Sequence, residues 1–516
     1  MSEIKKLAGE TVYYGASNII SRLLNYLLTP LYVALFRPDI YAEVGLLYAA
    51  LPFLNVIFTY GLQTAFFRFS QIEDRKKVLS TTFISILCST IILSLVLLSL
   101  RAPVSHSIIG EIAGITSHPE YLNWCVCILA FDSLAYIPFA QLRLENKPLR
   151  YATLKMLNVA FNIFFNVFFL VICPYLLSHG SPWIRMVYHP GMGVGYVFLS
   201  NVISSALTLL LLLPQISRIH WSFDPVIWKK IMQYSLPLII VGLAGMVNET
   251  LDRVYFLPSF LPASLGLKMK ATLIGIYSAN YKLSILITLF IQAFRLGAEP
   301  FFFRQAEGKN PQIIYARVMK YFVMILCMMF LCVSLFLSVW KYFMPRPEYW
   351  QGLRIVPTLL LANIFLGIYF NLTIWFKLTH RTRSGAVITI ITALLAFVFN
   401  YWWIPVMGYY GAALATMVCY GIQMIICYIW GQKIYPVPYP WKTLSAYILM
   451  AVAFYFVFYI FNRLILGASH QYALNPVSLA ISFLLLFTYG WILYRKEKLS
   501  IRSLLDFSRI FGMRKP

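Results

Sequence analysis

Long apolar segments repeat along almost the whole chain of 516 residues, and short polar stretches separate them. A helix that crosses the hydrocarbon core of a bilayer needs about 20 predominantly apolar residues. The pattern therefore predicts an all-α polytopic membrane protein with about 14 transmembrane helices. The segments lie at residues 11–36, 41–67, 79–100, 121–142, 151–177, 193–214, 232–256, 273–297, 313–343, 353–376, 385–405, 410–431, 444–466 and 476–494.

Composition supports this interpretation. Hydrophobic residues make up 60% of the chain and charged residues 12%, whereas soluble domains contain about 25% charged residues. The formal net charge of +24 would suggest a nucleic-acid partner in a soluble protein. Here the basic residues gather in the loops between apolar segments, so we expect no nucleic-acid binding.

The basic residues also predict the orientation of the chain. An even number of spans places both termini on one side of the membrane. Most of the 42 Lys and Arg lie at the termini and in the loops on that same side. Because such loops are cytoplasmic, both termini are predicted to be cytoplasmic. The nine basic residues on the other side are Arg37, Arg101, Arg185, Lys268, Lys270, Lys341, Arg346, Arg354 and Arg463.

Signals for metal, nucleotide or disulfide chemistry are missing from the sequence. The eight cysteines form no CxxC pair, and the seven histidines have no ligand spacing. We find neither a Walker A motif nor a GxGxxG fingerprint that opens a helix. No loop is long enough for a soluble catalytic domain. We therefore expect no metal, no cofactor beyond a coupling ion such as H⁺ or Na⁺, and no enzymatic activity.

The eighth segment carries polar and amphipathic groups at helical spacing along one face. A charged side chain at mid-bilayer costs about 2.5–3.5 kcal/mol on insertion scales, so it normally faces a partner or a water-filled cavity. Because this face includes an arginine, we interpret it as a water-accessible lining. Its members are Tyr277, Tyr281, Ser284, Thr288, Gln292, Arg295 and Glu299.

The first and fifth segments show a similar pattern. Arg22 lies between Asn18 and Asn25. It is about 16 Å from the start of the predicted segment at residue 11, which places it near the bilayer centre. This depth favours a cavity over lipid. In the fifth segment Asn158 and Asn162 begin a ladder that ends at Asn166. Such a ladder is equally compatible with a cavity lining and with helix packing.

Three acidic residues lie well inside predicted spans, away from their ends. In the seventh segment the i, i+4 spacing allows Glu249 to neutralise Arg253, which would leave Asp252 available to another helix or to a proton. A purely structural ion pair is equally compatible with this spacing. Asp132 lies in the fourth segment with no basic residue nearby in the sequence. It is equally compatible with a proton relay and with a partner such as Arg22.

A weak internal repeat suggests a duplicated architecture. Arg22 precedes a Gly–Leu–Leu–Tyr–Ala run at Gly45, and Arg253 precedes a Gly–Ile–Tyr–Ser–Ala run at Gly275. Two pseudo-symmetric bundles of six helices with a site between them are typical of secondary transporters. The predicted parts are a bundle at 1–214, a cytoplasmic linker at 215–230, a second bundle at 231–432, two extra helices at 433–495, and a basic interfacial tail at 496–516.

Two stretches resemble the Wzx-type polysaccharide flippases. The first runs from Tyr14-Gly15 through Leu24-Asn25-Tyr26 to Phe67-Arg68, and the second from Ile276-Tyr277 through Gln292 and Arg295 to Glu299-Pro300-Phe301. One departure from the family pattern is Tyr41-Ala42, where relatives usually have Tyr-Gly. The wider superfamily contains multidrug exporters and the lipid II flippase.

The resemblance implies the flipping of an undecaprenyl-diphosphate-linked oligosaccharide across the bacterial inner membrane by alternating access, for surface polysaccharide such as O-antigen or capsule. Membrane lipids and other polysaccharide-assembly proteins are the implied partners. A cationic lumen would hold the substrate through Arg22, Arg253, Lys282 and Arg295. The polar lining would comprise Asn18, Asn25, Asn158, Asn162, Tyr277, Tyr281 and Gln292, and the ion-coupling candidates are Asp132, Glu249, Asp252 and Glu299.

Three alternatives remain at the level of the sequence. A lipid II flippase would handle a related lipid diphosphate. An ion-coupled multidrug exporter would need a lumen dominated by carboxylates, which the four intramembrane bases argue against. A membrane glycosyltransferase or polymerase would need a catalytic exterior loop, but the longest, 101–120, carries isoleucines at 108, 109, 112 and 115 that indicate an interfacial helix.

Overall fold

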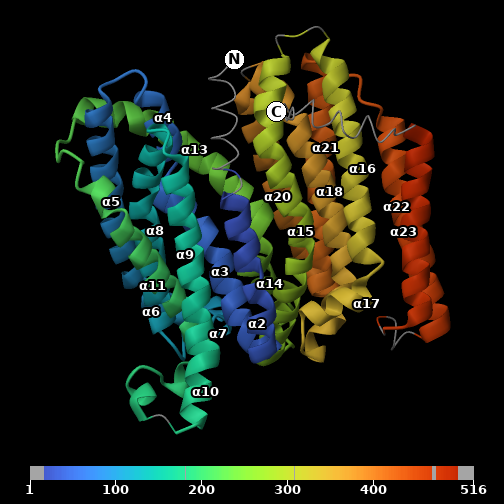
Figure 1. Ribbon diagram of the computed structural model, residues 1–516, viewed down its shortest axis with the longest axis horizontal. Helices are drawn as coiled ribbons and strands as arrows, with labels where there is room; N and C mark the ends of the chain where they lie inside the picture. Colours follow the sequence, from blue (N-terminus) through green and yellow to red (C-terminus); the bar gives the residue numbers. More distant parts are fainter. Residues whose placement is uncertain are drawn as a thin grey trace. The chain divides into compact units, whose positions relative to one another are not determined.

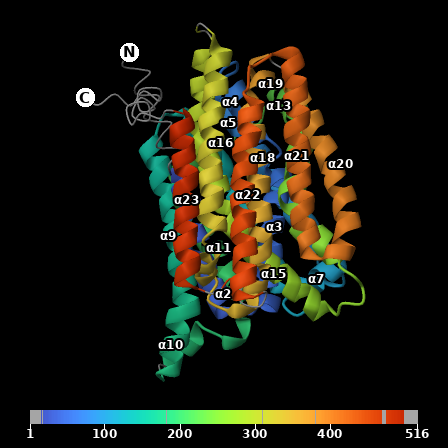
Figure 2. The same cartoon turned by 90° about the vertical axis from the view of Figure 1, so that its right-hand side faces the viewer.

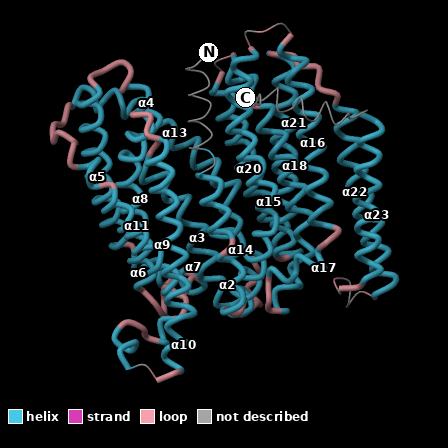
Figure 3. Tube along the Cα trace, in the orientation of Figure 1, coloured by secondary structure: helices cyan, strands magenta, loops and turns pink. Residues whose placement is uncertain are grey.

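The computed structural model describes residues 15, 17–180, 182–306, 308, 310–379, 381–467, 472 and 474–497. These residues form helices joined by loops and turns, with no β-strand among them (Figure 3). Twelve helices in this part of the chain are long and apolar enough to cross a membrane. The prediction of an all-α multi-pass membrane protein is thereby confirmed.

The fourteen predicted segments agree with the helices along most of their described residues. The sixth segment corresponds to the shorter apolar helix α11 (Gly195–Leu211). In the first segment, residues 17–26 are helical and α2 (Leu28–Leu35) follows after a turn. The predicted interfacial tail stays a prediction, because the residues beyond Glu497 are outside the described part of the chain.

The chain divides into two compact units. Unit 1 comprises the described residues of Met1–Ser278 and Ala393–Ala412, and unit 2 those of Ala279–Thr392 and Ala413–Pro516. The two units are defined by how compactly their residues pack. The two pseudo-symmetric six-helix bundles expected from the sequence repeat stay a prediction.

Unit 1 contains most of the helices of the N-terminal half (Figure 1). Its long helices pack along one another, and π-helical turns interrupt two of them at η1 (Phe168–Ile172) and η4 (Asp252–Phe256). Besides α2 and α11, the helices are α3 (Pro38–Thr59), α4 (Leu62–Phe69), α5 (Arg75–Ser99), α6 (Arg101–Ser105), α7 (Ile108–Ile112), α8 (Glu120–Leu144), α9 (Pro148–Val167), α10 (Cys173–Ser178), α12 (Leu213–Ile216), α13 (Pro225–Leu251) and α14 (Leu257–Phe260).

Unit 2 contains the C-terminal helices and most of α15 (Leu267–Gln305). Within it α16 (Pro311–Ser334) packs against both α22 (Trp441–Leu466) and α23 (Pro476–Glu497) (Figure 2). The other helices are α17 (Leu337–Trp340), η6 (Pro347–Ile355), α18 (Val356–Leu372), α19 (Ile374–Leu378), α20 (Thr382–Met407) and α21 (Tyr409–Ile434). Of these, α15, α20 and α21 each run from one unit into the other.

A backbone break splits the second predicted span. Tyr60 and Gly61 both have positive φ angles, of 31° and 71°, and they end α3 and begin α4. A Cβ on Gly61 would also lie 3.0 Å from the Cβ of Leu238 in α13. Glycine relieves both constraints because it adopts left-handed conformations at little cost. The Tyr60 hydroxyl, within hydrogen-bonding distance of Ser85 Oγ at 2.9 Å, joins the break to α5.

The two glycines of the internal repeat lie at one helix–helix contact. A Cβ on Gly275 would come within 1.8 Å of the carbonyl oxygen of Pro38, at the start of α3. Gly45 lies about two helical turns further along α3. A Cβ on Gly45 would come within 2.7 Å of Ser278. Small residues let helix backbones approach closely inside a membrane. The repeated Gly–x–x–Tyr and Gly–x–Tyr runs therefore bring α3 and α15 together.

An ion-pair cluster joins the last two helices to the rest of unit 2. Glu497, the final residue of α23, accepts hydrogen bonds from Lys320 of α16 and from the hydroxyl of Tyr447 of α22, the latter at 2.5 Å. The side chains of Lys320 and Glu497 are 23% and 10% exposed. Such a partly buried, multiply hydrogen-bonded carboxylate holds the three helices in one arrangement.

The connection 101–120 contains two short helices, α6 (Arg101–Ser105) and α7 (Ile108–Ile112). Of its isoleucines, Ile112 and Ile115 are buried whereas Ile108 is exposed. Helix α7 carries Ile108 and Ile112, and its Ser107 cap accepts a hydrogen bond from the amide of Gly110. Contact of this helix with a lipid surface stays a prediction.

Candidate functional site

Polar side chains of the first helix face α9 in unit 1. Asn18 Oδ1 accepts a hydrogen bond from the Tyr151 hydroxyl at 3.3 Å, and Asn25 Oδ1 accepts one from Asn162 Nδ2 at 3.2 Å. Arg22 lies on the same helical face between these contacts, and its side chain is exposed. Asn25 is exposed as well. The structure thus presents a guanidinium and an amide together at the surface of the first predicted span.

The asparagine ladder of α9 is used for helix packing. Asn158 donates to the Thr208 hydroxyl of α11 at 2.9 Å, and Asn166 accepts from the Tyr32 hydroxyl of α2 at 2.9 Å. Asn166 also donates to Asn162 Oδ1 at 3.0 Å. Of the two interpretations that the sequence left open, these contacts support packing. The assignment of Asn158 and Asn162 to a lumen lining stays a prediction.

Asp132 lies in α8 with its side chain exposed, although most of this span is buried in the protein. Its Oδ1 accepts a hydrogen bond of 2.8 Å from the Ser205 hydroxyl of α11. Lys155 of α9 is close enough to interact electrostatically with this carboxylate, and its ammonium lies 4.3 Å from the centre of the Phe139 ring. The cationic neighbour of Asp132 is therefore Lys155.

Lys155 was missed by the sequence analysis, which counted only four bases within the membrane. It lies eight residues into α9, within the fifth predicted segment. A signal was present, because Tyr151, Lys155, Asn158, Asn162 and Asn166 follow one another at steps of three or four residues. This spacing places them on one helical face.

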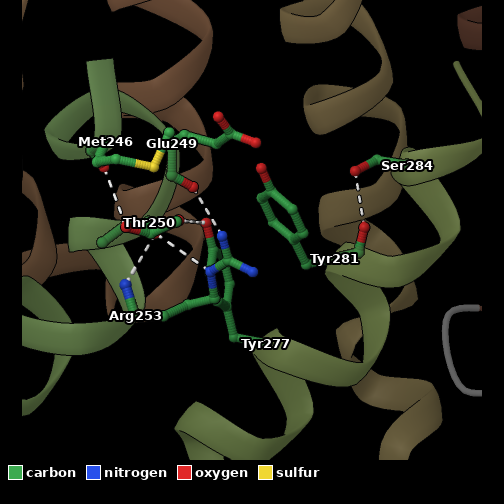
Figure 4. A network of polar contacts seen from close by, with 8 residues as sticks. Met246, Glu249, Thr250, Arg253, Tyr277, Tyr281 and Ser284 are labelled. Atoms are coloured by element: carbon green, nitrogen blue, oxygen red, sulfur yellow. Dashed lines mark hydrogen bonds and ion pairs between the residues drawn. The ribbon is translucent and has the colours of Figure 1, made fainter. Parts of the chain in front are cut away.

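A second polar cluster joins the seventh span to the start of α15 (Figure 4). The side chains of Asp252 and Arg253 are 7% and 9% exposed and form an ion pair, with Arg253 Nε 3.3 Å from Asp252 Oδ1. The Tyr277 hydroxyl donates to Asp252 Oδ2 at 2.5 Å. Arg253 also donates to the backbone carbonyl of Glu249 at 2.7 Å. Both carboxylate oxygens of Asp252 are thus engaged.

This arrangement corrects the expectation that Glu249 neutralises Arg253 and leaves Asp252 available. The ion pair is between Asp252 and Arg253, which are adjacent in the chain. They begin the π-helical turn η4, where the amide of Arg253 also donates to Asp252 Oδ1 at 2.8 Å. The i, i+4 rule assumes a regular α-helix, and a π turn changes the direction of each side chain.

The polar face of α15 changes character along its length. Tyr277, Tyr281 and Ser284 are buried, and the Ser284 hydroxyl donates to the carbonyl of Tyr281 at 2.7 Å. This half of the face packs inside the protein, where the sequence analysis expected a water-accessible lining. The remaining described members, Thr288, Gln292 and Arg295, are partly exposed, as is the neighbouring Lys282. The side chain of Glu299 lies outside the described residues.

A small pocket in unit 2 contains the predicted Arg295 and a second cation, Lys377. The guanidinium of Arg295 lies 4.0 Å from the centre of the Phe370 ring, within the range of a cation–π interaction. Lys377 lies in the last turn of α19 and was not among the predicted site residues. No sequence pattern connects it to Arg295, because the two are on different helices.

Neither a disulfide nor a metal site occurs among the described residues. All eight cysteines are free, and five of them are buried. No group of three or more His, Cys, Asp or Glu in the described part of the chain is arranged to hold a metal ion.

Comparison with other sequences identifies a family. The model of the family described as polysaccharide biosynthesis protein matches residues 7–304, which is more than half of the chain. None of the curated proteins compared matches the sequence significantly.

Comparison with solved structures identifies the fold. The lipid II flippase MurJ in an inward closed conformation matches with a TM-score of 0.70 at 14% identity, over 95% of this chain and 100% of its own. An inward-facing multidrug resistance MATE family transporter of the MOP superfamily matches with a TM-score of 0.60 at 15% identity, over 80% of this chain and 94% of its own. A MATE structure in the straight conformation gives 0.56 at 15% identity, over 83% and 95%. The chain is a multi-pass membrane protein of the polysaccharide biosynthesis protein family, with the fold of MOP-superfamily transporters.

Proposed function

We propose that the protein flips an undecaprenyl-diphosphate-linked oligosaccharide across the bacterial inner membrane by alternating access, for the assembly of a surface polysaccharide. Both termini would be cytoplasmic, as the distribution of Lys and Arg indicates. The substrate would cross without covalent change, so this activity requires no catalytic residue. Membrane lipids would surround the protein, and other polysaccharide-assembly proteins are its expected partners.

The observation that carries the proposal is the exposed Arg22 in the helix of the first predicted span, flanked by Asn18 and Asn25. A guanidinium offers paired donors that match phosphate oxygens. Amides both donate to and accept from glycan hydroxyls. This combination suits a substrate that carries a diphosphate next to sugars. Lys282 and Arg295 are proposed as further cationic contacts for the substrate, whereas Arg253, which is buried and paired with Asp252, stays a candidate from the sequence alone.

Ion coupling is proposed to involve Asp132 first. Asp132 is an exposed residue, and Ser205 and Lys155 supply a hydroxyl and a cation beside its carboxylate. A carboxylate in such a position can take up H⁺ or bind Na⁺. Asp252 is a weaker candidate because Arg253 and Tyr277 occupy both of its oxygens. Glu249 and Glu299 stay candidates from the sequence alone.

A lipid II flippase is the second candidate, because the fold of such a protein extends over 95% of this chain. Both substrates carry a lipid diphosphate, so the cationic residues would serve either one. A multidrug exporter shares the fold as well, but its cationic substrates would be repelled by Arg22, Lys282 and Arg295. The glycan and the charge of the ligand therefore separate the three possibilities.

Ligand-induced thermal stabilisation of the purified protein tests the proposal. A ligand that binds only the native state raises the unfolding temperature as its concentration increases. We would compare undecaprenyl-diphosphate oligosaccharide, lipid II and the organic cation ethidium on the wild type and on Arg22→Ala/Arg295→Ala. The matched control is Arg101→Ala/Arg381→Ala, which removes one exposed arginine from each unit.

Stabilisation by the lipid-linked oligosaccharide that is lost in the first double variant and kept in the control would support the proposal. Stronger stabilisation by lipid II would move the assignment to the second candidate. Stabilisation by ethidium alone, unaffected by either double variant, would overturn the proposal in favour of a drug exporter.

A further inference from the structure

The loop that joins α12 to α13 is fixed to the first turns of α5. The amide of Asp224 donates a hydrogen bond to the Thr81 hydroxyl of α5 at 3.1 Å. The indole of Trp228, in the first turn of α13, donates to the Ser85 hydroxyl of α5 at 3.0 Å. This loop runs beside α5 at the left edge of Figure 1. Residues 217–230, which we call the linker segment, therefore form a fixed part of unit 1.

These contacts fix the depth of the linker segment along a membrane-spanning helix. Helix α5 begins at Arg75 and has 25 residues, so it is about 37 Å long and extends about 4 Å beyond the hydrocarbon core at each end. Thr81 lies about 9 Å and Ser85 about 15 Å from its start. The linker segment therefore reaches the boundary between the lipid headgroups and the acyl chains.

Large apolar side chains of the linker segment are exposed. Trp221, Phe223 and Val226 are 66%, 45% and 65% exposed, and Trp228 is 39% exposed. The ring centroids of Phe223 and Trp228 are 6.1 Å apart, so these side chains form one surface. Exposed apolar surface of this kind marks an interaction site, and tryptophan is enriched where a membrane meets water. The exposed face thus fits a lipid surface.

Basic residues flank these apolar side chains. Arg218 and Lys229 are exposed, and Lys230 forms an ion pair of 2.7 Å with Glu73. Asp224 is the only acidic residue of the linker segment, and its carboxylate accepts hydrogen bonds from two backbone amides at the start of α13. Both carboxylates thus have partners within the protein. The charge of the exposed face is positive, which favours an anionic partner.

We propose that the linker segment binds an anionic glycerophospholipid of the cytoplasmic leaflet. Trp221 and Phe223 would lie at the ends of the acyl chains nearest the headgroups, and Arg218 and Lys229 would attract the headgroup. A lipid is favoured over a soluble partner, because the contacts with α5 hold the segment at the depth of the headgroup boundary. The inference rests on the proposed cytoplasmic orientation and goes beyond the proposed function, since this lipid is not the transported substrate.

Native mass spectrometry of the full-length protein in detergent tests the preference for an anionic lipid. It would give dissociation constants for dioleoyl phosphatidylglycerol and for dioleoyl phosphatidylcholine. Arg218→Gln/Lys229→Gln is expected to weaken phosphatidylglycerol binding about 30-fold, because each base near a membrane surface contributes about fivefold. This variant should leave phosphatidylcholine binding unchanged. Phe223→Ser/Val226→Ser removes apolar contacts only and should weaken the binding of both lipids several-fold.

Arg381→Gln/Lys433→Gln is the matched control, because it removes two exposed bases from unit 2 and changes the net charge equally. It should keep the wild-type affinity for both lipids. All substituted side chains are exposed, so the variants are expected to fold. Unfolding temperatures close to that of the wild type in lipid-free detergent would show this.

A spin label tests the depth of the linker segment in a bilayer. It would be attached at Ser222→Cys in a variant without native cysteines, since Ser222 is exposed between the two aromatic residues. In vesicles of phosphatidylglycerol and phosphatidylcholine, this label should be more accessible to oxygen than to nickel ethylenediaminediacetate. Gln71→Cys is the aqueous control, because Gln71 is exposed in the turn between α4 and α5, and its label should show the reverse.

The inference would be overturned if Arg218→Gln/Lys229→Gln and the control pair changed the affinity for phosphatidylglycerol equally. It would also be overturned if the labels at residues 222 and 71 were equally accessible to the nickel complex, because the exposed face would then lie in water and be open to a soluble partner. Translocation of the lipid-linked oligosaccharide enters into neither result, so the proposed function is tested separately.

Discussion

The hydroxyl of Tyr277 donates a 2.5 Å hydrogen bond to Oδ2 of Asp252 and thereby joins the start of α15 to the π-helical turn of the preceding span. Tyr277 is fully buried, and Arg253 pairs with the other oxygen of the same carboxylate. A buried charge is tolerated when its hydrogen-bonding capacity is used. This cluster therefore stabilises the packing of α15 against η4 in unit 1.

Substitution Tyr277→Phe is expected to destabilise the protein by about 1–3 kcal/mol, because it leaves one oxygen of a buried carboxylate without its donor. Thermal unfolding in detergent would measure the loss. Tyr494→Phe is the matched control, since Tyr494 is 46% exposed on α23. Equal unfolding temperatures for the two variants would contradict the role assigned to this hydrogen bond.

The Asp252–Arg253 pair should show strong coupling. Arg253→Ala removes one partner and leaves a buried carboxylate uncompensated, which typically costs about 3–5 kcal/mol. Arg253→Ala/Asp252→Asn removes both charges and should be less destabilising than the single variant. Denaturant unfolding of the two single variants and the double variant forms the thermodynamic cycle. Additive effects would show that the two side chains act independently.

Glycine is required where α15 meets α3. Gly275→Ala would place a methyl group 1.8 Å from the carbonyl oxygen of Pro38, so the helices must separate. We expect a loss of about 1–3 kcal/mol or more from overpacking. Gly245→Ala in α13 is the control, because nothing lies within 4 Å of its Cβ position. That variant should gain up to about 1 kcal/mol from helix propensity.

Water should reach Asp132 from the aqueous phase. In a variant without native cysteines, Asp132→Cys is expected to react with a membrane-impermeant methanethiosulfonate reagent. Ser133→Cys should be protected, because Ser133 is adjacent in the chain but fully buried. Labelling followed by a gel-shift assay would compare the two rates. Similar rates at both positions would contradict an accessible carboxylate at Asp132.

The fold was largely predictable from the sequence because spanning a bilayer imposes a strong pattern. An isolated apolar segment must satisfy its backbone hydrogen bonds internally, so it forms a helix. All fourteen predicted segments are helical through most of their described residues. The break at Tyr60-Gly61 was not predicted, because a left-handed turn leaves the hydrophobic pattern of residues 41–67 unchanged.

The candidate site was only partly predictable. Periodicity identified helical faces, such as the one that carries Arg22, but it gives no information on which helix lies opposite. Asp132 was therefore left without its neighbours Ser205 and Lys155. The predicted partner of Arg253, Glu249, was wrong because the π turn η4 does not follow α-helical spacing and pairs Arg253 with Asp252. Lys377 could not be associated with Arg295, since tertiary packing alone joins them.

Translocation in proteoliposomes tests the central claim most directly. A fluorescent undecaprenyl-diphosphate oligosaccharide would be incorporated in both leaflets, and a lectin added outside would report the fraction that becomes accessible with time. The proposal predicts rapid exposure with the wild type and with Arg101→Ala/Arg381→Ala, and slow exposure with Arg22→Ala/Arg295→Ala. Exposure at the rate of protein-free vesicles for the wild type, with ethidium transported instead, would contradict it.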